Sequence, residues 1–139
     1  MVEAIHVGKV RGDELLAVDS VRAVAGKGLE GDRHFQHEGG KPGKALTLIE
    51  AENVEAVGLP PGGARRQVTV RGVDLNALVG KRFRVGDVEC YGAHLCEPCA
   101  HLQSITRPGI IKDLAHRGGI NADILTDGTI SVGDAVVPL

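Results

Sequence analysis

The sequence is poor in the side chains that usually fill large hydrophobic cores. Of its 139 residues, two are Phe, one is Tyr, one is Met and none is Trp, so aromatic residues make up 2%. The core is therefore expected to consist of Val, Leu, Ile and Ala. The 20 glycines indicate short elements joined by tight turns, which predicts a β-rich fold with weak helix content.

Several protein classes are excluded by what the sequence does not contain. No apolar run is long enough to span a membrane, and the segment 1–4 has neither the basic start nor the apolar core of a secretory signal. The net charge of −2 argues against nucleic-acid binding, which needs a basic surplus. Three cysteines, an odd number, do not indicate a disulfide framework. We expect a cytoplasmic protein with free thiols that binds neither nucleic acid nor membrane.

The length and patterning predict a single domain over residues 1–139. Apolar or alternating stretches predict strands at 4–7, 18–24, 45–49, 67–70, 88–95, 120–125 and 135–138. Two similar phrases, 83–88 and 130–135, each predict a strand, a Gly-Asp turn and a second strand. Many short strands around one core predict a mainly β fold with a few short helices, arranged as a closed or nearly closed β-barrel.

Three short helices are expected between these strands. The first covers 50–57 and ends at Gly58 before a Pro-Pro pair. The second is a single turn at 75–79, with Asp74 as its N-cap, and the third covers 110–114. The stretch 26–43 is glycine-rich, charged and without apolar periodicity, which favours a functional loop.

The segment 94–101 concentrates the chemistry of the chain, because it places two cysteines and two histidines within eight residues. Pro98 suits the first turn of a helix, so Cys99 is expected in that turn, where unpaired N–H groups favour a thiolate. A thiolate can carry sulfur, ligate a soft metal or exchange disulfides. Cys99 is therefore the candidate catalytic residue and metal ligand.

Other interpretations of these cysteines remain open. Cys96 and Cys99 could be buried and inert at a strand-to-helix corner, as Cys90 is expected to be within its strand. Two Cys and two His also form a common structural zinc set, although four ligands from eight residues cannot easily surround a tetrahedron. A thioredoxin-like redox pair would need a βαβ context that the pattern does not show.

A second group of candidate residues is basic and lies in or beside glycine-rich loops. Arginine forks bind phosphate oxygens, and glycine lets backbone N–H groups approach an anion. These residues together predict a site for a phosphorylated ligand, although each one alone could be a solvated surface charge. They are Lys27, Arg33, Lys44, Arg65, Arg66, Arg71 and Arg117.

A series of segments along the chain resembles those of MOSC domains, the C-terminal module of molybdenum cofactor sulfurases. The segment 28–34 (GLEGDRH) is similar to the family's early loop, and 65–75 to its central segment, which usually has Asn where this chain has Gln67. The segments 78–87, 96–99 and 116–119 follow, with a closing Val-Gly-Asp at 132–134. Cys99 matches the family's signature cysteine. The resemblance covers nearly the whole chain.

The resemblance implies a β-barrel, like that of pyruvate kinase, associated with the molybdenum cofactor (molybdopterin). Cys99 would carry sulfur as a persulfide for delivery to a metal-sulfur centre, or would ligate molybdenum. The cofactor-binding candidates for the phosphorylated pterin ligand are Arg33, Lys44, Arg65, Arg66, Arg71 and Arg117. The protein would be a sulfur transferase or a molybdenum-dependent oxidoreductase, and the sequence does not separate these roles.

The expected partners follow from the same resemblance. No pyridoxal-phosphate site is expected within this chain, so a separate pyridoxal-phosphate cysteine desulfurase, or a molybdoenzyme, would be the partner. The alternative functions are a small molybdenum-dependent reductase of N-hydroxylated compounds, a zinc-stabilised binding module, or a barrel that mediates interactions without chemistry. Cys96 could resolve a persulfide into a disulfide, or simply pack. The chain is expected to be a monomer or a homodimer.

Overall fold

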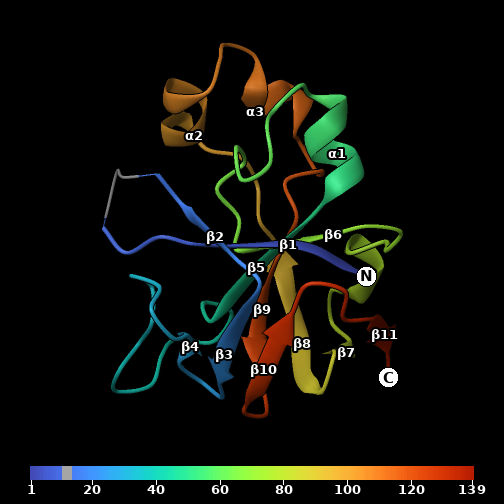
Figure 1. The fold of residues 1–139 in the computed structure, drawn as a ribbon. Helices are drawn as coiled ribbons and strands as arrows, with labels where there is room; N and C mark the ends of the chain where they lie inside the picture. The colour runs from blue at the N-terminus through green and yellow to red at the C-terminus, as the bar shows by residue number, and fades with distance from the viewer. Residues whose placement is uncertain (11–13) are drawn as a thin grey trace.

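A computed structural model describes residues 1–10 and 14–139 and contains two β-sheets (Figure 1). The larger sheet has eight strands in the order β11-β7-β8-β9-β5-β6-β1-β2, and the smaller has three in the order β10-β3-β4. The strands are β1 (Val2–Val7), β2 (Leu16–Val18), β3 (Ser20–Val24), β4 (Gly28–Leu29), β5 (Leu46–Glu50), β6 (Val68–Val70), β7 (Arg82–Val85), β8 (Val88–Leu95), β9 (Ile120–Ile124), β10 (Gly128–Ser131) and β11 (Val136–Pro138).

The two sheets are joined into a nearly closed barrel, as the sequence predicts. Asp19 alone separates β2 from β3, so the chain passes directly from one sheet into the other. At the opposite end of β1, the N–H of Val2 donates to the carbonyl oxygen of Asp134 at 2.7 Å. The N–H of Gly133 donates in return to the carbonyl oxygen of Val2 at 2.8 Å. These bonds tie the turn before β11 to the first strand.

The barrel interior is aliphatic, with Phe83 as a buried aromatic side chain. Buried and exposed residues alternate along β3 and β7, and buried and half-buried residues along β9, as expected for strands with one face toward a core. Apolar side chains from both sheets meet in one continuous cluster. The composition therefore predicts the core correctly.

Short helices cover one end of the barrel, where Figure 1 shows α1, α2 and α3 grouped together. They are α1 (Ala51–Ala56), α2 (Ala100–Ile105) and α3 (Ile110–Asp113), and a 3₁₀ turn, η1 (Asn76–Leu78), lies before β7. Leu102 of α2 packs with Ile110 and Leu114, and Leu59 contacts this group and the one beneath α1. None of the helices in the described residues has the length and apolar character needed to cross a membrane.

Local patterns predict most of these elements, and long-range contacts explain the exceptions. The helix predicted at 50–57 is α1, and the left-handed Gly58 follows it with its N–H bonded to the Glu55 carbonyl oxygen. Asp74 is not an N-cap, because η1 begins after Leu75 without a side-chain cap. The phrase 83–88 forms the β7–β8 hairpin. The phrase 130–135 does not form a hairpin, because β10 pairs with β3 and β11 pairs with β7.

Candidate functional site

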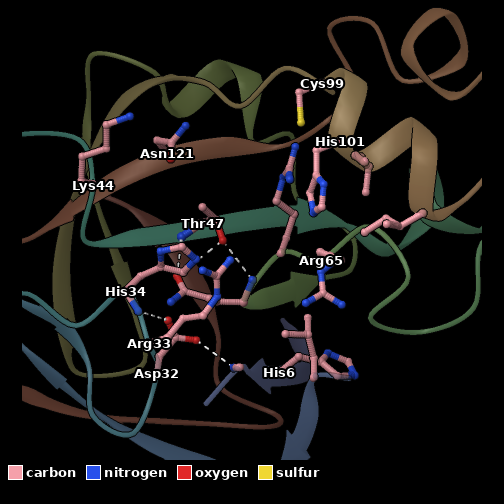
Figure 2. A pocket seen from close by; sticks show the side chains of 16 residues that line it. His6, Asp32, Arg33, His34, Lys44, Thr47, Arg65, Cys99, His101 and Asn121 are labelled. Carbon is pink, nitrogen blue, oxygen red and sulfur yellow. Dashed lines mark hydrogen bonds between the residues drawn. The ribbon is translucent and has the colours of Figure 1, made fainter. Parts of the chain in front are cut away.

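A cavity of about 350 Å³ gathers Cys99 and most of the predicted basic residues. It is lined by β1, the loop before β5, the loop before β6 and the start of α2 (Figure 2). Among the described lining residues, Asp32 carries the one carboxylate. The cationic lining residues are Arg33, Lys44, Arg65 and Arg66. In a chain with a net charge of −2, this concentration of positive charge favours an anionic ligand.

Cys99 lies at the start of α2 and is exposed. It occupies the N-cap position with an extended backbone, one residue before the first helical turn in which it was expected. The Cys99 side chain is drawn on the cavity side of the helix start in Figure 2. An exposed thiol beside a cationic cavity is accessible to a reagent or a ligand, so Cys99 is not the buried residue of the alternative interpretation.

The segment that carries the thiols is held in place by backbone contacts. The N–H of Cys96 donates to the carbonyl oxygen of Gly119 at 2.8 Å. The guanidinium of Arg66 donates to the carbonyl oxygens of Cys96 at 3.0 Å and Gly118 at 2.9 Å, and to that of Ala64 at 3.3 Å. Arg66 therefore lines the cavity while its donors fix the thiol segment.

Glu97 anchors the same segment from its other side. Its Oε1 accepts the backbone N–H of His116 at 2.8 Å, and its Oε2 lies 3.0 Å from the His116 Nδ1. The carbonyl oxygen of His116 accepts a bond from the Asn76 side chain at 2.9 Å. His116 has a left-handed backbone with φ of 61°. The residue after Cys96 is thereby tied to the loop that leads into β9.

The other two cysteines differ from Cys99 in exposure. Cys90 is fully buried in β8, as expected, and its burial, with Asp123 and Glu89 nearby, raises the pKa of its thiol to about 12. Cys96 is half-buried. All three thiols are free. Cys90 is thus a core residue, whereas Cys96 and Cys99 are within reach of solvent.

Asp32 positions the glycine-rich loop against the cavity, a role that the sequence pattern did not assign to it. The side chain is buried and accepts the N–H of Gly8 at 3.0 Å and that of His34 at 2.9 Å. The N–H of Arg33 donates to the carbonyl oxygen of Gly8 at 2.7 Å. The loop between Gly26 and Gly43 therefore reaches the end of β1 and presents Arg33 and His34 to the cavity.

Of the remaining cationic residues, Lys44 reaches the cavity from the end of the same loop and Arg65 from the loop before β6. Arg65 has a left-handed backbone with φ of 58°, which is unusual for a residue with a side chain and recurs at functional sites. Lys44 follows Gly43, whose N–H donates to the Asp123 carboxylate at 2.5 Å. The strands behind them, β5 and β6, are joined by bonds between Thr47 and Gln67.

Two histidines of the cavity were not predicted as site residues. His6 on β1 and His34 on the loop both line it. Burial lowers the pKa of each imidazole below its ordinary value, and the nearby Arg33 adds to this effect at His34. The sequence gives no signal for either, because isolated histidines without a partner spacing are usually surface or core residues.

Three of the predicted basic residues lie outside this cavity. Arg71 pairs with Glu3 at 2.6 Å and with Glu55, so it joins β6 to β1 and α1. Arg117 lines a separate hollow with Lys112 and Asp113. Lys27 is not among the lining residues. The cavity thus brings together four of the six cofactor-binding candidates.

The histidines of the thiol segment do not complete a zinc site. Within residues 1–10 and 14–139, no three His, Cys, Asp or Glu side chains come together as a metal-binding group. The Nδ1 of His94 instead lies 3.4 Å from the side-chain nitrogen of Asn121. The described residues therefore offer no ligand set for the zinc-stabilised module.

Comparisons with known proteins are consistent with this architecture. The sequence model of the MOSC domain matches residues 34–137. The crystal structure of the YuaD protein from Bacillus subtilis is similar with a TM-score of 0.80 at 17% identity, covering 97% of this chain and 92% of that one. YiiM from Geobacillus stearothermophilus gives a TM-score of 0.76 at 19% identity, covering 100% and 75% of the two chains. YiiM from Escherichia coli gives 0.71 at 17%, covering 100% and 70%. At these identities the structures share a fold. A search of curated proteins found no match.

Proposed function

Because the chain belongs to the MOSC domain family, we propose that its cavity binds the molybdenum cofactor through the cofactor's phosphate, with Cys99 as sulfur carrier or metal ligand. The observation that supports this proposal is the meeting of an exposed thiol and four cationic side chains in one cavity. A phosphorylated pterin with a metal-sulfur centre needs both kinds of group.

The chemistry of the donor set fits such a ligand. Arginine and lysine bind phosphate oxygens, and a thiolate suits molybdenum and sulfur. The cavity volume lies within the range of about 300–1,000 Å³ that is usual for small-molecule sites. When bound, the cofactor would supply oxygen-atom or sulfur chemistry at molybdenum. The protein's own residues would bind, orient and shield it.

The cationic residues have different roles in this proposal. Arg33 and Lys44 lie near the two ends of the loop between β4 and β5. Both side chains are exposed and can contact a phosphate. Arg65 adds a third cation from the loop before β6. Arg66 donates to three backbone carbonyl oxygens, so it orients Cys96 and the residues that follow, and only its charge acts on the ligand.

The carrier step can be written for Cys99 alone. Its thiolate attacks the outer sulfur of a persulfide on a separate pyridoxal-phosphate cysteine desulfurase. A sulfur–sulfur bond forms on Cys99, the donor's sulfur–sulfur bond breaks, and the donor cysteine leaves as a thiolate, so no net oxidation occurs. In this proposal Cys96, three residues away and half-buried, attacks the inner sulfur, forms a disulfide with Cys99 and releases the outer sulfur as hydrosulfide.

The first experiment is metal and pterin analysis of the purified protein beside its Cys99→Ser variant. The host should make molybdenum cofactor, and Arg33→Ala and Arg117→Ala should be matched charge variants inside and outside the cavity. We expect pterin near one equivalent, reduced by Arg33→Ala and unchanged by Arg117→Ala. Pterin that is retained equally by all these variants would contradict binding in the cavity.

The same samples separate the two roles of Cys99. Molybdenum that is lost in Cys99→Ser identifies Cys99 as a ligand and directs the next assay to reduction of N-hydroxylated compounds. Sulfane sulfur that appears on Cys99 after incubation with a cysteine desulfurase identifies a carrier. A protein that takes up neither pterin, molybdenum nor sulfane sulfur would overturn the proposal.

A further inference from the structure

His6 is a buried histidine in the wall of the cationic cavity, and it has no part in the function proposed above. It lies on β1, and 7% of its surface is exposed. Its backbone N–H donates to the Gln67 carbonyl oxygen at 2.7 Å, and it pairs with Ala17 of β2. Its place in the sheet is therefore fixed by the backbone, and its ring is free to serve the cavity.

The ring of His6 lacks the partners that a buried polar group normally has. Its Nδ1 is buried and makes no hydrogen bond to the described residues. A buried polar atom without a partner destabilises the fold, so such atoms are rare and are often explained by function. The opposite edge of the ring faces Gly62, where a Cβ would lie 2.8 Å from Cδ2 and Nε2. Gly62 thus leaves room for the imidazole beside the cavity.

Burial of the His6 ring favours its neutral form in the free protein. Burial lowers the pKa of His6 below its ordinary value. The strand β2 beside it offers no titratable group. The titratable or charged groups that share the cavity come from the loop before β5, from the loop before β6 and from the start of α2. They are Asp32, Arg33, His34, Lys44, Arg65, Arg66, Cys99 and His101.

An anion in the cavity favours the protonated form of the His6 ring instead. It neutralises the cations that oppose a further positive charge, and it offers an acceptor to a ring that has none. We propose that an anion entering the cavity causes His6 to take up a proton from water, so that His6 joins the cationic side chains that hold it. The proton forms an N–H bond on the ring and returns to water when the anion leaves.

This inference rests on the proposed function only in requiring an anion in the cavity. It adds that binding is coupled to proton uptake, so affinity is highest below the pKa of His6 in the free protein and falls as the pH rises from there through the pKa of His6 in the complex. An opposite charge close to a titratable group usually shifts its pKa by about 1–3 units. Each unit corresponds to about a tenfold change in affinity.

The test is an NMR titration of the histidine rings in sodium sulfate and in sodium chloride at equal ionic strength. Sulfate keeps its charge across the pH range used, so any proton that is taken up lies on the protein. We expect the His6 signal to titrate below its ordinary range in chloride and about 1 unit higher in sulfate. His37, which contacts Phe35 and does not line the cavity, is the internal control.

Two variants keep the result specific. His6→Asn removes the shifted signal and, if it folds, the pH dependence of sulfate affinity. If His6→Asn does not fold, Arg33→Ala serves instead, because it weakens sulfate binding and should reduce the shift at His6. A His6 signal that is the same in sulfate and chloride would overturn the inference, whether or not sulfate binds.

The outcome is distinguishable from a failure of the proposed function. Protein that is purified with pterin but shows no sulfate effect at His6 retains the proposed function and loses this inference. Protein that shows the His6 shift but never holds pterin, molybdenum or sulfane sulfur retains the proton-coupled anion site and loses the proposed function.

Discussion

Arg66 donates a hydrogen bond from Nη2 to the carbonyl oxygen of Cys96 at 3.0 Å, across 30 residues of sequence. The same guanidinium binds the Gly118 and Ala64 carbonyl oxygens, so one side chain joins the loop before β6, the thiol segment and the loop before β9. The thiols are therefore positioned by a neighbouring loop and not by the strand β8 alone.

Replacing Arg66 should loosen the thiol segment. Arg66→Met leaves three carbonyl oxygens without a donor, and we expect a loss of about 2–4 kcal/mol in the free energy of unfolding. Urea denaturation measures this loss, and Arg66→Lys should recover only part of it because an ammonium cannot reproduce the planar fork. Arg84→Met, at an exposed arginine of β7, should change the unfolding midpoint little.

The three cysteines should react with a disulfide reagent in a fixed order. Cys99 is exposed and should react first, Cys96 is half-buried and should follow, and Cys90 should react only after unfolding. Raising the pH to 9 should not release Cys90, because its pKa of about 12 lies about three units higher. Mass spectrometry after timed labelling identifies each thiol, and labelling of Cys90 in the native protein would contradict the assignment.

Gly118 should be intolerant of a side chain, since a Cβ there would lie 2.3 Å from the Cys96 carbonyl oxygen. Gly118→Ala should displace the thiol segment and cost about 1–3 kcal/mol, with faster labelling of Cys96. Gly40→Ala is the matched control, because its Cβ would meet only the flexible Gln36 side chain. Equal unfolding midpoints for the two variants would show that the thiol segment moves freely.

Asp32 should affect anion binding more by positioning the loop that carries Arg33 and His34 than by its negative charge. Asp32→Asn keeps the shape of the side chain but loses one acceptor for the N–H groups of Gly8 and His34, so we expect a loss of about 1–3 kcal/mol. Sulfate affinity should fall as Arg33 and His34 move. An increase in sulfate affinity would mean that repulsion of the anion by the Asp32 carboxylate outweighs the effect of Asp32 on the position of the loop. Asp87→Asn, on the exposed β7–β8 turn, is the control.

Glu50 should make stability depend on pH. Burial raises the pKa of its carboxyl group, and its Oε1 makes no hydrogen bond within the part of the chain that the structure describes. The folded protein therefore holds this proton more tightly than the unfolded chain. The stabilisation is complete below the unfolded pKa and is lost as the pH rises through the folded pKa. Urea denaturation of Glu50→Gln should thus show a higher free energy of unfolding at pH 7, by less than about 1 kcal/mol because the group is partly exposed, and no increase at pH 4. Glu14→Gln is the exposed control.

Elements with a local signal could be predicted from the sequence. The helix α1 follows from a short helical run that ends at Gly58, and β8 follows from its apolar stretch between a Gly-Asp turn and the thiol segment. The pairing of β10 with β3 and of β11 with β7 could not be predicted, because each partner strand lies far away in the sequence. Such contacts leave no trace in a local pattern.

The candidate site also combines features that have a local signal in the sequence with features that depend on distant contacts. Cys99 could be predicted as a candidate from residue type and spacing. Arg65 and Arg71 look alike in the sequence, but Arg71 is paired with Glu3 and Glu55, which lie 68 and 16 residues away. The role of His6 depends on burial in a wall built by distant loops. Residue type indicates what a side chain can do, whereas only the fold decides which side chains meet.

The bonds between Val2 and the turn at residues 133–134 also constrain how the chain folds during synthesis. During synthesis, Val2 leaves the ribosome long before its partners at residues 133–134 are made, although β6 pairs with the same strand. Until then, the N–H and carbonyl groups of Val2 lack these partners, a state prone to association with other chains. The barrel should therefore form late and slowly, as expected for a topology dominated by distant contacts. A nascent chain arrested before residue 133 should remain sensitive to protease.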